Sequence, residues 1–309
     1  MAEALYHPTD GFYAVHGHAG RRGDFLTSPE VGPLFGALIA RYLDRCWDVL
    51  GRPDPFRFVD FGAGPATLAR SIELYEPNCL PVLEYVAVEI STLQRQSHPE
   101  WVQSTEDLPD RAHVLLANEL FDNVPFDVVD RAGAQRLLVD VAGDKFVEFW
   151  PEGPPDVRLP LQREARRLTE QIIDCCHGGF ALIIDYMRPT LEDFVGQRWI
   201  RTYRDHELGY EPLVDPGLWD ITADVALGSL VAELVAPRCR TQAEFLTDQG
   251  MEELVAQGKA AWQVGAARGD LEALRGRSRV SEAEALLEPD GLGGFTVLEW
   301  DLTESSDAV

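Results

Sequence analysis

One stretch, residues 57–70, constrains the fold of this chain more than any other. Its apolar start predicts a strand at 57–61, and its end has the pattern of a helix at 65–75. Between them stand Gly62 and Gly64, which can take positive φ angles and allow a ligand to lie against bare backbone. A strand, a glycine turn and a helix form the first unit of a nucleotide-binding α/β sheet.

A second strand pattern, at residues 84–90, carries an acid near its end, Glu89. In such sheets an acid at the end of the second strand holds the hydroxyls of a ribose. The alternative is that the glycine turn is one of many similar turns and that Glu89 only begins a helix. The two features together favour a cofactor site. The turn at 105–109 then adds Glu106 and Asp107, where the base or amine of a ligand could be contacted.

Three polar residues follow the next strand pattern, at residues 114–117: Asn118, Glu119 and Asp122. Open α/β sheets bind their ligands at the carboxyl ends of the strands, so these side chains are expected beside the glycine turn. Each of them alone could instead cap a helix. As a group they are candidates for the catalytic residues.

The rest of the chain predicts an α/β fold with insertions. Residues 5–30 read as a loop, either a lid or a surface arm, and the segment 126–150 alternates as an antiparallel meander does. Further patterns predict helices at 29–50, 160–176, 224–236 and within 243–287, strands at 179–186 and 294–300, and an irregular segment at 197–224. We expect an N-terminal loop and helix (1–56) and a main domain (57–309) with insertions at about 126–150 and 197–290.

The net charge of −25 limits the partners of the chain. Such a charge repels nucleic acids and anionic membranes, although the acids could also simply be scattered for solubility. No apolar run reaches the ~18 residues of a spanning helix, and the N-terminus has no secretory signal. Five cysteines without a CxxC spacing predict free thiols, no metal site and a reducing, cytoplasmic location.

Several sequence blocks resemble one family, the MidA-like S-adenosylmethionine-dependent methyltransferases. Mitochondrial members of this family are complex I assembly factors that methylate an arginine of a complex I subunit. The matching blocks keep the order of the family and lie at residues 5–13, 23–30, 61–68, 88–91, 118–125, 183–186, 203–206, 220–222 and 241–242.

The resemblance implies a class I methyltransferase sheet, which is Rossmann-like, with an inserted antiparallel meander and a helical elaboration for the substrate. It implies S-adenosylmethionine as cofactor, with the 23–30 loop closing over its methionine end and Glu89 holding its ribose. Asn118 and Glu119 would lie by the methyl group. The cofactor-binding residues expected in this way are Gly23, Asp24, Phe25, Thr27, Ser28, Pro29, Gly62, Gly64, Glu89, Ile90, Glu106, Asp107 and Asn118.

By family analogy the methyl acceptor is a protein, at an arginine side chain. Glu119 and Asp122 would orient the guanidinium, with Asp24 and Glu30 as reserves. One departure is Ala66, which stands where the family usually has a third glycine. Two alternatives stay open: a non-catalytic assembly factor that binds S-adenosylmethionine, and an NAD-type oxidoreductase on the same sheet. The oligomeric state is open as well, with a homodimer among the options.

Overall fold

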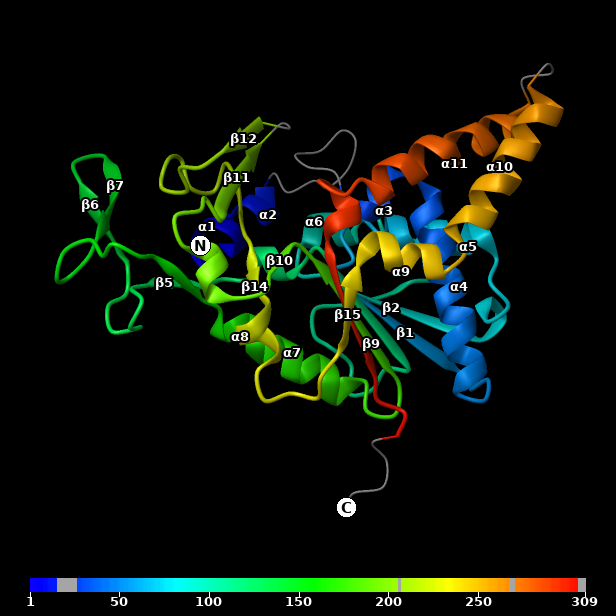
Figure 1. The fold of residues 1–309 in the computed structure, drawn as a ribbon, viewed down its shortest axis with the longest axis horizontal. Coiled ribbons are helices and arrows are strands. Elements are labelled where there is room, and N and C mark those ends of the chain that lie inside the picture. Colours follow the sequence, from blue (N-terminus) through cyan, green and yellow to red (C-terminus); the bar gives the residue numbers. More distant parts are fainter. Residues whose placement is uncertain (16–26, 205–206, 267–269, 305–309) are drawn as a thin grey trace.

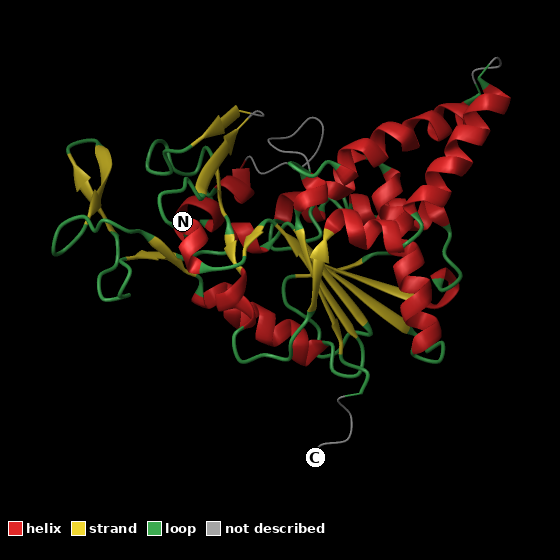
Figure 2. Ribbon diagram, viewed as in Figure 1, coloured by secondary structure: helices red, strands yellow, loops and turns green. Residues whose placement is uncertain are grey.

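The computed structural model describes residues 1–15, 27–204, 207–266 and 270–304, and it is built around a twisted central sheet (Figures 1 and 2). Seven strands form this sheet in the order β3-β2-β1-β4-β9-β16-β15. All neighbours from β3 to β9 are parallel, whereas β16 runs antiparallel to β9 and to β15. The strands are β1 (Phe56–Phe61), β2 (Leu83–Val88), β3 (Gln103–Thr105), β4 (Val114–Asn118), β9 (Phe180–Asp185), β15 (Arg238–Thr241) and β16 (Thr296–Asp301).

The strand order reverses between β1 and β4, because β1 pairs with β2 on one side and with β4 on the other. At such a switch point the loops after the two strands diverge and leave a crevice at their carboxyl ends. This is the sheet that the sequence predicted, and the expected fold class is confirmed.

Helices cover both faces of the sheet and bury alternate side chains of its strands. In β1, Phe58 faces one core and Val59 faces the other. The first core is closed by α4 (Pro33–Val49), α5 (Thr67–Tyr75), α9 (Gln242–Asp248), α10 (Met251–Gly265) and α11 (Leu271–Leu287). The second is closed by α7 (Arg163–Cys175) and α8 (Leu227–Val231). In Figure 1, α10 and α11 form a hairpin that projects from the body.

The helix predicted at 29–50 is divided in two at Gly32, which precedes Pro33. The short α3 (Ser28–Val31) ends there, and Pro33 begins α4 as its first residue. The next predicted helix also starts later than expected, because α5 begins at Thr67. Ala66 takes a left-handed φ of 57°, so the residue that replaces the third glycine of the family has a glycine-like backbone. The loop expected at 5–30 overlaps the end of α1 (Ala2–Tyr6) and includes α2 (Phe12–Val15), and its residues 16–26 lie outside the described part of the chain.

Short strands build a second layer beside the sheet, seen at the left of Figure 1. The segment 197–224, expected to be irregular, contains a three-stranded antiparallel sheet in the order β12-β11-β13. Within the predicted meander, β6 and β7 form a hairpin, but β5 pairs with β8 rather than with β6. These strands are β5 (Asp127–Val129), β6 (Leu138–Ala142), β7 (Lys145–Phe149), β8 (Leu159–Leu161), β10 (Met187–Arg188), β11 (Ile200–Arg204), β12 (Glu207–Gly209), β13 (Asp220–Ala223) and β14 (Val225–Ala226).

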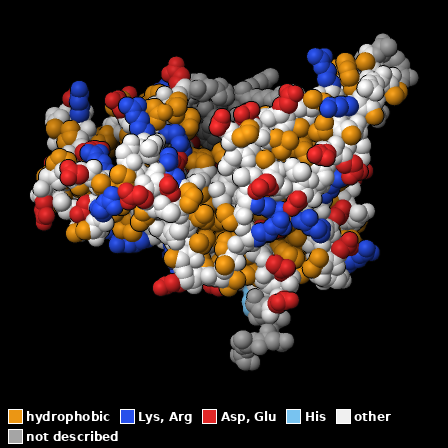
Figure 3. All heavy atoms as spheres, viewed as in Figure 1, with side chains coloured by type: hydrophobic (Ala, Val, Ile, Leu, Met, Phe, Trp, Pro, Cys, Tyr) orange, Lys and Arg blue, Asp and Glu red, His pale blue; other side chains and the backbone are white. Residues whose placement is uncertain are grey.

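Acidic side chains are scattered over the one face of the molecule that Figure 3 draws. On the face drawn in Figure 3, Asp and Glu side chains alternate with basic and apolar ones and gather into no single patch. Among the helices of the described residues, none combines the length and the apolar character needed to cross a bilayer. All five cysteines are free thiols, and four of them are buried. The division of the chain at residue 56 stays a prediction.

Candidate active site

A cavity of about 430 Å³ opens at the carboxyl ends of β1, β2 and β4, where the strand order reverses. Its volume lies in the range of pockets that hold a cofactor-sized molecule. Its lining comprises Tyr6, Tyr13, Thr27, Pro29, Glu30, Asp60, Phe61, Gly62, Ala63, Gly64, Pro65, Thr67, Leu68, Val88, Glu89, Ile90, Gln94, Glu106, Asn118, Glu119, Leu120, Asn123, Val124, Pro125, Glu164 and Leu168.

The glycine turn forms one wall of this cavity. Gly62 and Gly64 have φ angles of 79° and 54°, in the left-handed region that favours glycine. The N–H groups of Gly62 and Ala63 both donate to the carbonyl of Val88, at 2.9 and 3.2 Å, which ties the turn to the end of β2. A Cβ on Gly62 would lie 3.0 Å from the Cδ1 of Leu120. The wall is therefore bare backbone, open to a ligand.

Glu89 joins the glycine turn to the segment after β2. Its carboxylate accepts the N–H of Gly64 on Oε2 at 2.9 Å and the N–H of Ser91 on Oε1 at 2.7 Å. Burial raises the pKa of Glu89, and the two backbone N–H groups oppose that rise because they favour the charged form. Each carboxylate oxygen keeps acceptor capacity, so the group can still receive two hydroxyls from the cavity.

Glu119 follows β4 and has a strained backbone, with φ at 50°. Its Oε1 accepts the N–H of Ser28 at 2.8 Å and the Nδ2 group of Asn118 at 2.9 Å. Burial nevertheless raises its pKa to about 7, with Asp122 adding to the rise. Asn118 lines the cavity, and its Oδ1 atom is buried with no hydrogen-bond donor among the described residues.

Behind Glu119 lies a second layer of acids. The hydroxyl of Tyr186 donates to Asp122, and Asp185 accepts the N–H groups of Phe121 and Asp122 at 2.9 and 3.3 Å. Burial raises the pKa of Asp122 to about 6. Burial also raises the pKa of Asp185 well above its usual range, and the nearby carboxyls of Asp122 and Glu119 add to that rise. Asp122 does not line the cavity.

Two tyrosines from the N-terminal segment complete the cavity. The rings of Tyr6 and Tyr13 are stacked with centroids 5.5 Å apart. Both hydroxyls donate to Asn123, at its backbone oxygen and its Oδ1 respectively, each at 3.0 Å. Asn123 in turn donates to Asp220 of β13 at 2.9 Å. The N-terminus is thereby fastened to both the sheet and the inserted strands.

Of the residues predicted for the site, most of those that the structure describes line this cavity. They are Thr27, Pro29, Gly62, Gly64, Glu89, Ile90, Glu106, Asn118, Glu119 and the reserve Glu30. Ser28 contacts Glu119 from behind, and Asp107 and Asp122 lie outside the lining. Gly23, Asp24 and Phe25 fall outside the described residues.

Sequence reasoning missed Asp60, Asn123 and the two tyrosines as site residues. Asp60 carried a signal, since an acid inside an apolar strand is unusual. The hydroxyl of Tyr85 donates to the carboxylate of Asp60 at 2.6 Å, and burial raises the pKa of Asp60 to about 7. Across the described residues, no group of three or more His, Cys, Asp or Glu side chains could hold a metal ion.

Comparison with known proteins assigns the chain. Residues 38–238, well over half of its length, match the sequence model of a family described as "Putative S-adenosyl-L-methionine-dependent methyltransferase". The chain belongs to this methyltransferase family. The prediction of a methyltransferase that uses S-adenosylmethionine is thereby confirmed, and the NAD-type oxidoreductase is the wrong alternative.

Relatives and solved structures agree with this assignment. The methyltransferase is 27% identical over 317 residues to the mitochondrial protein arginine methyltransferase NDUFAF7 homolog of Drosophila melanogaster, covering 84% of this chain and 71% of that one. It is 26% identical to NDUFAF7 of Mus musculus, covering 82% and 70%. A crystal structure from Burkholderia thailandensis with S-adenosyl-homocysteine bound superposes with a TM-score of 0.79 at 25% identity, covering 96% of this chain and 85% of that one.

These relatives correct one prediction. The cytoplasmic location expected from the free cysteines is wrong, since the curated relatives of the methyltransferase are named as mitochondrial proteins. Free cysteines indicate a reducing rather than an oxidising compartment, but they do not indicate which reducing compartment it is. The absence of nucleic acid and membrane partners and the oligomeric state stay predictions.

Proposed function

We propose that this methyltransferase modifies a protein at an arginine side chain, and that Glu119 orients the guanidinium in the cavity. The observation that carries the proposal is a buried carboxylate lining the cavity at the end of β4, next to the glycine turn. Both relatives compared above are named protein arginine methyltransferases, which supports the same acceptor.

The cavity suits the cofactor of the family. When bound, S-adenosylmethionine supplies a methyl group on a positively charged sulfonium. Gly62 and Gly64 would leave room for its methionine part, and Glu89 has acceptor capacity for its ribose hydroxyls. Asn118 lines the same cavity and is proposed to lie beside the methyl group. The remaining residues proposed to hold the cofactor are Thr27, Pro29, Ile90 and Glu106 from the lining, with Ser28 and Asp107 outside it.

The acidic layer suits a cationic acceptor. An ionised carboxylate pairs with a guanidinium through charge-assisted hydrogen bonds and fixes its plane. Glu119 lines the cavity and would make this contact, whereas Asp122 lies one layer behind and would add negative potential. The stacked Tyr6 and Tyr13 give the cavity a flat wall, against which a planar cation can lie.

The cofactor part of the proposal is tested by titration calorimetry with S-adenosyl-homocysteine. Glu89→Ala removes the proposed ribose acceptor and the partner of the Gly64 N–H, so affinity is expected to fall about a hundredfold. Glu84→Ala is the matched control, because Glu84 lies near the start of the same strand β2, pairs with Arg57 at 2.9 Å and does not line the cavity, so its loss should leave the affinity unchanged. Equal losses in the two variants would contradict the role of Glu89.

The acceptor part is tested with synthetic peptides and S-adenosylmethionine labelled in its methyl group. Paired peptides that carry arginine or lysine at one position are offered to the enzyme, and label is expected on the arginine members only. Glu119→Gln is expected to lower the transfer rate at least a hundredfold, as loss of a key charged contact does, while S-adenosyl-homocysteine still binds. Label on lysine or on peptides without arginine would overturn the arginine assignment.

A further inference from the structure

One block that the cavity does not explain is Thr241-Gln242, at the start of α9. The Gln242 side chain is fully buried, and its Oε1 accepts the hydroxyl of Ser28 at 2.9 Å. Its Nε2 lies 3.5 Å from the carbonyl of Leu286 in α11, and its backbone N–H donates to Phe295 at 2.7 Å. A buried amide with these partners joins α9 to α3, more than 200 residues earlier in the chain.

Ser28 carries this contact onward to the active site. It is fully buried at the start of α3, and its backbone N–H donates to the Oε1 of Glu119. Gln242, Ser28 and Glu119 thus form one hydrogen-bonded line from α9 to the cavity. The left-handed backbone of Glu119 fixes the position of its Cα atom, but the side chain has several rotatable bonds. Its carboxylate therefore needs hydrogen bonds to stay in one place.

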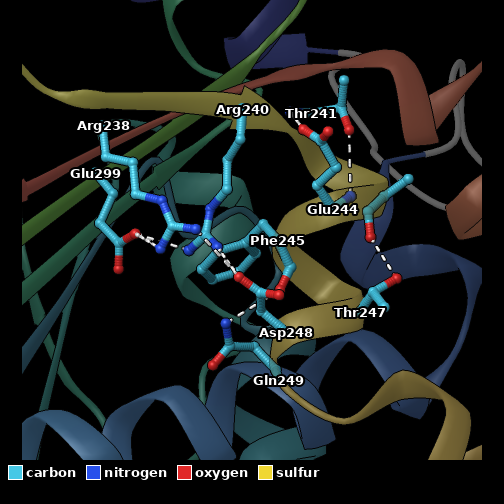
Figure 4. A network of polar contacts seen from close by, with 10 residues as sticks. Arg238, Arg240, Thr241, Glu244, Phe245, Thr247, Asp248, Gln249 and Glu299 are labelled. Carbon is cyan, nitrogen blue, oxygen red and sulfur yellow. Dashed lines mark hydrogen bonds and ion pairs between the residues drawn. The ribbon is translucent and has the colours of Figure 1, made fainter.

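Ion pairs and a helix cap hold the start of α9, where Gln242 is the first residue (Figure 4). The side chain of Arg240 is nearly buried over the ring of Phe245 and pairs with Asp248 of α9 and with Glu299 of β16, the latter at 2.7 Å. Thr241 and Glu244 cap α9 reciprocally, side chain to backbone, at 2.8 and 3.2 Å. The first residue of α9 is therefore held on the edge of the central sheet.

A second contact holds the same N-terminal segment from α11. The carboxylate of Glu282 is buried, accepts the N–H of Leu34 at 2.9 Å and receives the hydroxyl of Ser278 at 2.6 Å. A Cβ on Gly32 would lie 2.3 Å from the carboxyl carbon of Glu282. The junction of α3 and α4 is thus enclosed by the C-terminal helices, which leaves Ser28 little freedom to move away from Glu119.

We propose that Gln242 is a positioning residue of the methyltransferase: acting from α9 through Ser28, it fixes the Glu119 carboxylate at the cavity. The inference rests on the proposed role of Glu119. It assigns the C-terminal helices a part in the reaction that their distance along the sequence from the cofactor motifs does not suggest.

The test measures the ratio of the affinities for S-adenosylmethionine and S-adenosyl-homocysteine by calorimetry at pH 8. A carboxylate held beside the methyl group favours the sulfonium of the first ligand over the neutral sulfur of the second. General loss of stability leaves this ratio unchanged. Gln242→Met keeps the side-chain length and removes the acceptor, whereas Ser28→Ala removes the same hydrogen bond from the other side.

The matched control is Gln249→Met. Gln249 is also buried and directly follows α9, and its side-chain amide donates to the carbonyl of Phe245 within that helix at 3.0 Å (Figure 4). We expect Gln242→Met and Ser28→Ala each to lower the ratio about fivefold, as loss of one buried hydrogen bond does, and the double variant to lower it no further. Gln249→Met is expected to lower the melting temperature and to leave the ratio unchanged.

Two results separate the possible failures. If Glu119→Gln lowers the ratio while Ser28→Ala and Gln242→Met leave it as in the wild type, the positioning role is wrong and the role of Glu119 stands. If Glu119→Gln also leaves the ratio unchanged, the carboxylate does not lie beside the methyl group, and the positioning role of Gln242 is wrong together with that placement of Glu119. Should Gln242→Met not fold, Ser28→Ala against Gln249→Met decides the question, since it removes a single oxygen atom from the same contact.

Discussion

At the scale of single residues, Glu119 is held in an unfavourable state. Its backbone is left-handed, and burial raises the pKa of its carboxyl from an ordinary 4.5 to about 7. Such a group binds its proton more tightly in the folded than in the unfolded chain. Its contribution to stability is complete below about pH 4.5 and is lost as the pH rises through 7.

The first prediction follows from that sign. The free energy of unfolding of the cofactor-free protein is expected to fall between pH 5 and pH 8, with Glu119 accounting for up to about 3 kcal/mol of the fall. Urea unfolding at several pH values measures it. Asp60 and Asp122 act in the same direction, so the contribution of Glu119 is read from the difference between wild type and Glu119→Gln. Parallel curves for the two proteins would contradict the buried state of this carboxyl.

Sequence reasoning located some of these residues and could not have located others. Glu89, Asn118 and Glu119 were predicted because each stands at the carboxyl end of a predicted parallel strand. In such a sheet, ligands bind in the crevice at these ends, where the strand order reverses. Tyr6 reaches the cavity because the N-terminus folds back onto the segment after β4, where its hydroxyl donates to the backbone oxygen of Asn123. That contact spans 117 residues and leaves no periodic pattern in the sequence.

At the scale of the elements, the packing of α4 on α5 sets the position of the glycine turn, since α5 begins directly after it. The two helices meet closely at Gly36. A Cβ at Gly36 would lie 2.3 Å from the Cβ of Ser71, far closer than two carbon atoms can approach. Only a glycine lets α5 lie this near to α4.

The second prediction is that Gly36→Ala destabilises the protein by about 1–3 kcal/mol, because α5 must move away from α4. At an open position within a helix the same change would stabilise by about 1 kcal/mol, so the sign alone is decisive. Urea unfolding gives the free energy. Calorimetry with S-adenosyl-homocysteine should show weaker binding as well, since displacement of α5 also moves Gly62 and Gly64. A more stable variant would mean that the two helices are not in close contact.

The long, strongly patterned elements were predicted well and the short ones were not. The strands β1, β2, β4 and β9 are mostly buried, largely apolar runs. Such runs are typical of strands in a parallel sheet that is covered on both faces, so they could be predicted from the sequence. By contrast β15 has four residues, all of them at least partly exposed, and it belongs to the sheet only through its pairing with β16. The sheet of β11, β12 and β13 was missed because its strands are only three to five residues long, although they pair close together in the sequence, with Arg204 opposite Glu207 and Tyr203 opposite Asp220.

At the scale of the whole molecule, charge is the dominant feature. The chain has 52 acidic and 27 basic residues, and the acids are spread over the surface drawn in Figure 3. A net charge this far from zero destabilises a compact state through repulsion between like charges. Exposed ion pairs such as Arg131 with Glu192 offset little of that repulsion, since surface pairs contribute at most about 1 kcal/mol each.

The third prediction is that salt stabilises this protein. At 0.01 M ionic strength charges interact over about 30 Å, whereas at 0.1 M they are screened beyond about 10 Å. Raising sodium chloride from 10 to 300 mM should therefore relieve the repulsion among the acids more than it weakens the ion pairs. We expect the melting temperature to rise by about 2 °C or more, in line with a gain near 1 kcal/mol. Potassium chloride should act equally, because screening depends on ionic strength and not on the cation. A falling melting temperature would mean that ion pairs, rather than the surplus of acids, dominate the electrostatic free energy of the fold.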